Sequence, residues 1–176
     1  MHLDAQTSEQ FVNALVDDCC RELFAAYGLL LGKCRHELPP QSASPLSWAT
    51  LSFHASAGTG ELVFAASEEV LRESGPLALD SASACDWLCE LANQLLGRVK
   101  SRLLLRGVEL VLATPKGRCG EYNSVTLAPD PRAQTFAVGG GYFCAWIRCT
   151  FHEGLDLGIS RARASGVPAE GELLLF

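Results

Sequence analysis

The sequence predicts a single α+β domain in which helices pack on a mostly antiparallel sheet. Two observations support this fold class. First, three segments are predicted to be helices, because they have apolar residues at helical spacing or a helix-capping serine. Second, these segments lie before or between runs rich in β-branched and aromatic residues, which predict strands. The expected order is a helix, a hairpin, two helices and then several strands. It lacks the regular alternation of strand and helix that is typical of a parallel sheet.

Composition restricts the class of protein. The chain has 176 residues, of which 48% are hydrophobic and 19% are charged, so we expect a well-buried globular domain and not a disordered chain. A net charge of −6 gives no electrostatic support for binding to nucleic acid. The sequence has no apolar stretch of about 18 residues and no signal-peptide pattern near Met1, so we expect a cytoplasmic protein that does not cross a membrane.

The eight cysteines are expected to be reduced thiols, because no export signal accompanies them. Most lie in apolar segments, where cysteine behaves as a small hydrophobic residue. Cys85 and Cys89 lie four residues apart in a predicted helix and could bind a metal. There is no CxxC pair and the four histidines are scattered, so the core interpretation is favoured and no metal or cofactor is expected to belong to this chain.

The first half of the chain predicts a helix, a hairpin and a short helix. Thr7 or Ser8 can cap the first helix, which we expect to end at Gly28. Residues 48–67, "WATLSFHASAGTGELVFAAS", contain two strand-like runs around a glycine-containing turn, which is typical of a β-hairpin. Residues 67–74 then predict a short helix with Ser67 as its capping residue.

The second half predicts one long helix followed by strands. The helix runs from about Ser83 to Arg106 and stops at Gly107. The expected strands are "VELVLATP" (108–115), Tyr122–Ala128, Gln134–Val138 and Tyr142–His152, with a turn at Gly139–Gly141. Residues 1–159 are expected to form the domain. Residues 160–176 are expected to form a C-terminal extension, made of a linker and an apolar end, "ELLLF", that could dock as an edge strand.

The long helix has two contrasting faces at 100° per residue. One face is apolar and predicts the contact with the core; it contains Leu88, Leu91, Ala92, Leu95 and Val99, flanked by Leu96 and Leu103. The opposite face contains Asp86, Glu90, Asn93, Gly97 and Lys100. On that face, Glu90 and Asn93 are neighbours that point outward.

The ordinary interpretation of such a pair is a solvated helix face, but two features favour a docking face. Asparagine is a mediocre helix former, so its place in the middle of a helix suggests a function. Gly97 costs about 1 kcal/mol relative to alanine in a helix interior. A glycine one turn after Asn93 removes bulk and allows another surface to approach closely.

The segment "CELANQLLGRVKSRLLLRGVELVLATP" resembles the signature region of the CheX-type phosphatases of bacterial chemotaxis, in the wider CheC/CheX/FliY group. That region has E-x-x-N on a long helix, then a glycine, a basic residue, a glycine stop, and a strand that runs into proline. The matching residues here are Glu90, Asn93, Gly97, Lys100, Gly107 and Pro115. The opening helix and the hairpin fit the same order, so the resemblance covers roughly residues 9–157. Its fold would be the α+β, CheC/CheX-like one.

The resemblance implies an enzyme that hydrolyses the phospho-aspartate of a CheY-like response regulator in two-component signalling. CheC-type relatives carry two E-x-x-N helices, and the single motif here matches the CheX type. An amide at Asn93 suits the orienting of a water molecule, because it both accepts and donates hydrogen bonds without adding negative charge beside a phosphoryl group. The resemblance assigns to Glu90 a salt bridge with a lysine of the receiver domain.

Further expectations concern the partner. Asp86, Gly97 and Lys100 would contact the receiver, which would itself supply a divalent ion such as Mg²⁺. The resemblance also implies a homodimer paired through strands in the C-terminal half. An alternative is a CheX-like docking module that binds a receiver or another signalling protein without catalysis. The segment "TPKGRCG" and the C-terminal extension favour this alternative, because both depart from the family pattern.

Overall fold

The computed structural model describes residues 5–32, 46–55, 58–75, 80–118 and 133–151. In chain order, its elements are α1 (Ala5–Ala26), β1 (Leu46–Ala55), β2 (Gly58–Ser67), α2 (Glu68–Ser74), α3 (Ser81–Leu104), β3 (Val111–Leu112), β4 (Lys116–Arg118), β5 (Gln134–Val138) and β6 (Gly141–Phe151). The expected strand at 122–128 and the expected extension at 160–176 lie outside these residues. None of the described helices is long and apolar enough to span a membrane.

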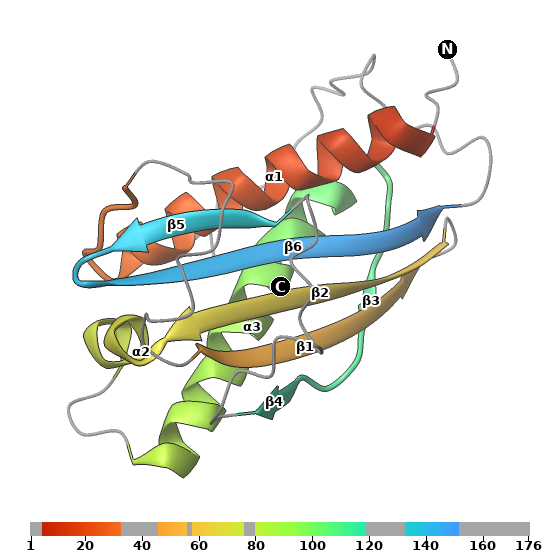
Figure 1. The fold of residues 1–176 in the computed structure, drawn as a ribbon. Helices are drawn as coiled ribbons and strands as arrows, with labels where there is room; N and C mark the ends of the chain where they lie inside the picture. The colour runs from red at the N-terminus through yellow and green to blue at the C-terminus, as the bar shows by residue number, and fades with distance from the viewer. Residues whose placement is uncertain (1–4, 33–45, 56–57, 76–79, 119–132, 152–176) are drawn as a thin grey trace, which may run out of the picture.

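The described strands form one six-stranded sheet in the order β3–β1–β2–β6–β5, with β4 paired to β1 beside β3. All of these pairings are antiparallel. Helices α1 and α3 lie together on one face of the sheet (Figure 1). The predicted fold class, an α+β domain with helices on an antiparallel sheet, is therefore confirmed.

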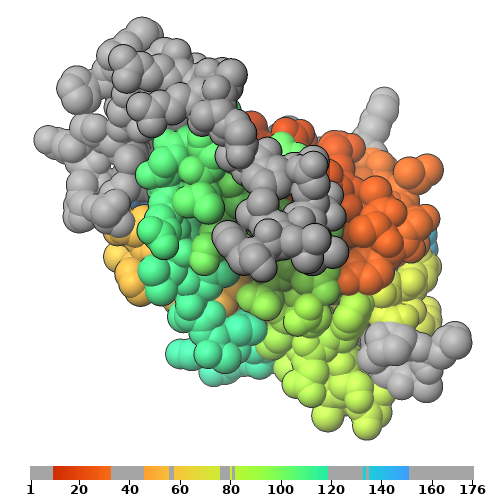
Figure 2. Space-filling view, turned by 180° about the vertical axis from the view of Figure 1, so that it is seen from behind, coloured from red at the N-terminus to blue at the C-terminus, as the bar shows by residue number. Residues whose placement is uncertain are grey.

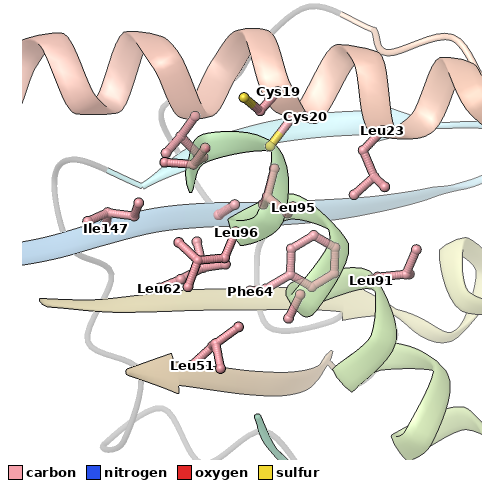
Figure 3. Close-up of a cluster of buried hydrophobic side chains, with 14 of the residues drawn as sticks. Cys19, Cys20, Leu23, Leu51, Leu62, Phe64, Leu91, Leu95, Leu96 and Ile147 are labelled. Carbon is pink, nitrogen blue, oxygen red and sulfur yellow. The ribbon is translucent and has the colours of Figure 1, made fainter. Parts of the chain in front are cut away.

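The main core fills the space between these helices and the sheet (Figure 3). The apolar face of α3 is completely buried, as its periodicity predicted; Leu88, Leu91, Leu95 and Val99 each have 0% exposure. Beside them, aromatic rings from α1 and the sheet stack on one another, with 4.3 Å between the ring centroids of Phe24 and Phe143. Close packing against α1 and against the sheet therefore fixes the rotation of α3 about its axis.

A smaller apolar cluster occupies the opposite face of the sheet. It comprises Val63, Ala65, Ala133, Cys144 and Trp146, with Trp48 packed against it. These β1, β2 and β6 side chains alternate along their strands with those of the main core, because successive strand residues point to opposite faces. Both faces of the central strands are therefore apolar over part of their length.

The end of α1 follows the prediction, and its beginning does not. Gly28 adopts a left-handed conformation, with φ of +73°, and its N–H donates to the Ala25 carbonyl at 3.0 Å. This geometry is the usual way in which glycine ends a helix. The helix begins at Ala5, so Thr7 and Ser8 lie inside its first turn and are not its N-cap.

Ser67 precedes α2 at the predicted N-cap position, but its side chain makes no capping hydrogen bond. The Ser67 hydroxyl instead accepts a hydrogen bond from the Tyr142 N–H, at 3.3 Å. The serine therefore ties α2 to β6. The predicted position of the capping serine is confirmed, but the prediction that its side chain caps the helix by a hydrogen bond was wrong.

Gly139 and Gly140 form the β5–β6 turn and Gly141 begins β6; glycine is favoured at 139 by its backbone conformation and at 141 by close packing against α2. Gly139 has a φ of +52°, and a β-carbon there would collide with the carboxylate of Glu73. At Gly141 a β-carbon would collide with the Ser67 hydroxyl. The Glu73 carboxylate also accepts a hydrogen bond from the Gly140 N–H, at 3.3 Å. The predicted turn is confirmed.

Strand β6 extends over Gly141–Phe151, close to the predicted range, and it lies inside the sheet. Strand β2 pairs with it over almost its whole length, whereas β5 pairs only with its first part, Gly141–Ala145. From Trp146 onward, one side of β6 has no partner strand among the described residues. Among the described strands, pairing therefore covers one side of β6 and the first part of the other.

The strand expected from "VELVLATP" is shorter in the structure than predicted. Only Val111–Leu112 pair with β1, opposite His54 and Phe53. A further strand, β4, was not predicted; it pairs Lys116–Arg118 with the beginning of β1. The edge of the sheet next to α3 thus consists of two short strands.

Truncation of the buried face of α3 tests this packing. We expect Leu91→Ala or Leu95→Ala to lower the free energy of unfolding by about 2–5 kcal/mol, because each removes a wholly buried side chain and leaves a cavity. Leu104→Ala is the matched control on the same helix, since Leu104 is 55% exposed. Urea denaturation measures all three. A loss below about 0.5 kcal/mol at Leu91 or Leu95 would show that the core face is wrongly assigned.

Candidate functional site

The candidate site lies on α3, whose first turn is fixed by Asp80. The Asp80 carboxylate accepts a hydrogen bond from the Ser83 N–H at 2.8 Å, so Asp80 is the N-cap. Hydrogen bonds from the side chain and backbone of Ser83 hold the pKa of Asp80 below its ordinary value. The helix therefore starts at Ser81, two residues before the predicted start, with a charged cap that favours the helix N-terminus.

The structure brings the five predicted site residues together on the outer face of α3. Asp86, Glu90 and Asn93 are exposed, and Gly97 and Lys100 are partly exposed. In the view from behind, α3 lies at the surface between α1 and the β3–β4 edge (Figure 2). The site is thus an open helix face, which suits contact with another macromolecule better than enclosure of a small ligand.

Gly97 has no local structural reason to be glycine. A β-carbon built at this position would have no atom within 4 Å, outside its own helix backbone and its chain neighbours. Its φ is not in the left-handed region. The helix therefore bears the entropic cost of a glycine, about 1 kcal/mol, where alanine would fit.

Two further residues, which the sequence analysis did not identify, form a chain of hydrogen bonds that ends at Glu90. Gln94 Nε2 donates a hydrogen bond to Glu90 Oε1 at 2.8 Å. The Tyr27 hydroxyl, from the segment after α1, donates to Gln94 Oε1, also at 2.8 Å. The spacing of four residues between Glu90 and Gln94 was visible in the sequence, whereas the contact with Tyr27 was not.

Where α1 and α3 meet, basic side chains form ion pairs with acidic residues of α1. Arg102 pairs with Glu22 and lies 4.0 Å from an Asp18 carboxylate oxygen. On α1 itself, Arg21 pairs with Asp17 at 3.4 Å. Within the described part of the chain, the hydrogen bond that reaches the Glu90 carboxylate comes from neutral Gln94. Its negative charge therefore remains available to a partner.

Cys85 and Cys89 lie on the side of α3 that faces β4. A β-carbon on Gly117 would be 2.6 Å from Cys89 Sγ and 3.0 Å from Cys85 Sγ, so the strand backbone packs directly on both sulfurs. Burial, with smaller contributions from Cys85 and Asp86, raises the pKa of Cys89. Cys89 is partly buried against the main core, whereas Cys85 is partly exposed and belongs to neither apolar cluster. The packing therefore supports the core interpretation for Cys89.

Comparison with solved structures identifies the fold. The structure of CheX from Desulfovibrio desulfuricans matches with a TM-score of 0.57 and 13% identity, over 79% of this chain and 99% of that one. CheX from Vibrio vulnificus matches with a TM-score of 0.54 and 14% identity, over 76% and 97%. A chain of the CheX–CheY–BeF₃–Mg²⁺ complex from Borrelia burgdorferi matches with a TM-score of 0.50 and 13% identity, over 80% and 97%.

No protein-family model and no curated protein matches the sequence. The structural matches nevertheless span almost the whole length of the chemotaxis proteins concerned. The chain therefore has the fold of the CheC/CheX class of chemotaxis proteins, as the resemblance in its long helix implied. Within that class the matches include CheX structures, at identities that establish the fold alone.

Replacement of Gly97 tests whether the glycine serves folding. We expect Gly97→Ala to raise the free energy of unfolding by about 0.5–1 kcal/mol, because the β-carbon meets no atom and the unfolded chain loses freedom. Gly117→Ala is the control, and it should destabilise the protein because its β-carbon would overlap Cys89 Sγ. Chemical denaturation compares the two. A less stable Gly97→Ala protein would contradict the open space seen around this residue.

Proposed function

We propose that this protein removes the phosphoryl group from the phospho-aspartate of a CheY-like response regulator. The observation on which the proposal rests is the exposed Glu90–Asn93 pair on the outer face of α3, in a domain with the CheX fold. One structural neighbour comes from a complex of CheX with CheY. A receiver partner would also place the protein in the cytoplasm, where response regulators are phosphorylated.

The reaction requires a correctly placed water molecule more than it requires a nucleophile on the protein. A phospho-aspartate is an acyl phosphate, which hydrolyses when water attacks the phosphorus in line with the leaving carboxylate. A new phosphorus–oxygen bond forms to the water, the phosphorus–oxygen bond to the aspartate breaks, and the water protons leave with the phosphate. The receiver would hold the divalent ion, such as Mg²⁺, that neutralises the phosphoryl charge.

Asn93 is the residue that we assign to the water. Its side chain is exposed, so it can enter the active site of a docked receiver. The amide oxygen would accept a hydrogen bond from the water and the amide nitrogen could donate to a phosphoryl oxygen. A carboxylate at this position would repel the phosphoryl group, so the neutral amide fits the task.

Glu90 is assigned to recognition of the receiver. It lies one helical turn before Asn93 on the same exposed face, so both side chains would reach one receiver together. Its carboxylate would pair with the active-site lysine of the receiver. The ion pair would fix the docking geometry and draw the lysine away from the phosphate. Neither residue forms a covalent bond to phosphorus in this proposal.

The remaining face residues would shape the contact. At Gly97 the open space would let the receiver backbone approach α3 closely. Asp86 and Lys100 lie on either side of the central pair along the helix and could form polar contacts at its margins. Surface charges of this kind affect the association rate and specificity more than affinity.

The alternative function is a docking module that uses the same face without turnover. The favouring observation is the segment after α3, where "TPKGRCG" departs from the family pattern and its residues Lys116–Arg118 form the short strand β4 beside the helix. Phosphate release from a phosphorylated receiver distinguishes the two functions. A receiver that binds at the α3 face and retains its phosphoryl group would favour the docking module.

We also propose that the protein forms a homodimer through its sheet. Strand β6 is apolar and long, and it lies in the C-terminal half of the chain. The resemblance to the CheX-type proteins implies pairing through strands of this half, and long apolar strands are prone to such pairing where an edge is open. We expect light scattering at micromolar concentration to give twice the mass of the chain. A monomeric mass would contradict the proposal.

Replacement of Asn93 and Glu90 should have different kinetic effects. Asn93→Ala should lower the turnover of the phosphorylated receiver by about 100-fold or more, because a catalytic hydrogen-bonding group is lost, and affinity should change little. Asn93→Asp should be at least as damaging, because it adds negative charge beside the phosphoryl group. Glu90→Ala should weaken binding instead, with a defect that shrinks at saturating concentrations. Phosphate release and titration of the receiver measure these effects.

Replacement of a residue elsewhere on the protein surface serves as the control. Ser52→Ala alters an exposed residue of β1, away from α3, and should leave both turnover and affinity unchanged. If Asn93→Ala and Asn93→Asp both dephosphorylate the receiver at the wild-type rate, Asn93 has no catalytic role. The docking module would then replace the phosphatase as the proposed function.

A further inference from the structure

We propose that Gln94 is a positioning residue, anchored by Tyr27, that holds the Glu90 carboxylate in the geometry needed to receive the partner's lysine. This inference rests on the proposed function, because it assigns a role to residues around the docking face. It concerns two residues that lie outside the E-x-x-N motif. Its evidence is a chain of contacts that connects Glu90 with α2 and with the end of α1.

The first contact restrains an exposed carboxylate. Gln94 lies four residues after Glu90, and its Nε2 donates to Glu90 Oε1 at 2.8 Å. An exposed glutamate normally samples several rotamers, and ordering it costs free energy at the moment of binding. The hydrogen bond removes part of that cost beforehand. It also leaves the second carboxylate oxygen available to an incoming cation.

The second contact anchors the Gln94 amide to the segment after α1. The Tyr27 hydroxyl donates to Gln94 Oε1 at 2.8 Å, so the amide oxygen faces Tyr27 and the amide nitrogen faces Glu90. In the reverse orientation the amide oxygen would lie against the carboxylate, and both atoms are acceptors. The acceptor-only carboxylate of Glu90 therefore sets the amide orientation, and the Tyr27 hydroxyl holds Gln94 in it by donating to Oε1.

The third set of contacts holds Tyr27 in place. Its ring meets Trp87 edge to face, with 5.5 Å between the centroids and 83° between the planes. Trp87 Nε1 donates to Ser74 Oγ at 3.1 Å, and the buried Ser74 hydroxyl donates to the Val70 carbonyl at 2.7 Å. The orientation of Glu90 thus depends on contacts from α2 and from the segment after α1. Such support by packed and hydrogen-bonded neighbours is what makes a functional side chain precise.

The neutral charge of Gln94 is essential to this role. A lysine at the same position could reach Glu90 and form a helix ion pair, which would hold the carboxylate but cancel its charge. Arg102, a basic residue on α3, pairs with Glu22 and Asp18 of α1 instead. An amide restrains Glu90 and preserves its full negative charge for the receiver's lysine.

A purely structural role for Gln94 predicts different consequences. The Gln94–Glu90 pair would then stabilise α3 slightly, and a glutamate–lysine pair at the same spacing would do so at least as well. Gln94→Lys therefore separates the two interpretations. It should maintain or raise the melting temperature of the protein and yet weaken binding to the receiver, because it neutralises Glu90 and repels the receiver's lysine.

The experiment measures the dissociation constant for a CheY-like receiver from the same organism, activated with beryllofluoride and Mg²⁺. We expect Gln94→Ala and Tyr27→Phe to raise it about three- to tenfold, the effect of losing one ordinary hydrogen bond. Gln94→Lys should raise it further. Phosphate release should be slower at limiting concentrations of each variant, and the defect should shrink at saturating concentrations, because Asn93 is unchanged. Circular dichroism confirms that each variant is folded.

A double variant determines whether Gln94 acts through Glu90. If it does, Gln94→Ala should have no further effect on affinity in a Glu90→Ala background. An equal loss in both backgrounds would overturn the inference, and so would wild-type affinity in Gln94→Lys. If Glu90→Ala weakens binding but the Gln94 variants do not, this inference fails and the proposed function stands. If Glu90→Ala itself binds normally, the recognition role proposed for Glu90 fails as well.

Discussion

The burial of one face of α3 is the constraint on which the rest of the structure depends. Leu88, Leu91 and Leu95 are completely buried against the sheet, so the helix cannot rotate about its axis without exposing them and opening cavities. Each such loss would cost about 2–5 kcal/mol, a large part of the stability of an ordinary domain. Since the rotation is fixed, Glu90 and Asn93 must face outward. The apolar core therefore determines the direction of the polar pair, and no polar contact is needed to do so.

Much of the fold could be predicted because its signals are local and periodic. The two faces of α3, the hairpin and the glycine turn all follow from spacing or from backbone preference. The features that the sequence did not predict depend on contacts between residues that are far apart in the chain. Strand β4 has the sequence Lys-Gly-Arg, which has no strand preference, and it is placed by the packing of Gly117 against Cys85 and Cys89. Likewise, the Ser67 hydroxyl accepts from Tyr142, which is 75 residues away in the chain.

The candidate site shows the same division between local and distant signals. Spacing alone was enough to predict that Glu90 and Asn93 are neighbours on an outward face. The same spacing places Gln94 one turn after Glu90, but periodicity does not reveal what anchors its amide. That contact comes from Tyr27, 67 residues earlier in the chain. It exists because α1 ends beside α3 and Gly28 turns the chain there, which is a property of the tertiary fold.

The residues that stabilise this domain are largely different from those that we propose to recognise a partner, and the distribution of charge explains why. The ion pairs between Arg102 and α1 are exposed, and pairs of that kind contribute little to stability. The fold is held by apolar burial, so the polar side chains on the outer face of α3 have little influence on whether the chain folds. They are therefore available for selection by a partner. Gly97 lowers helix stability at a position where alanine would fit, and the docking of a receiver that we propose for this face would give that cost a function.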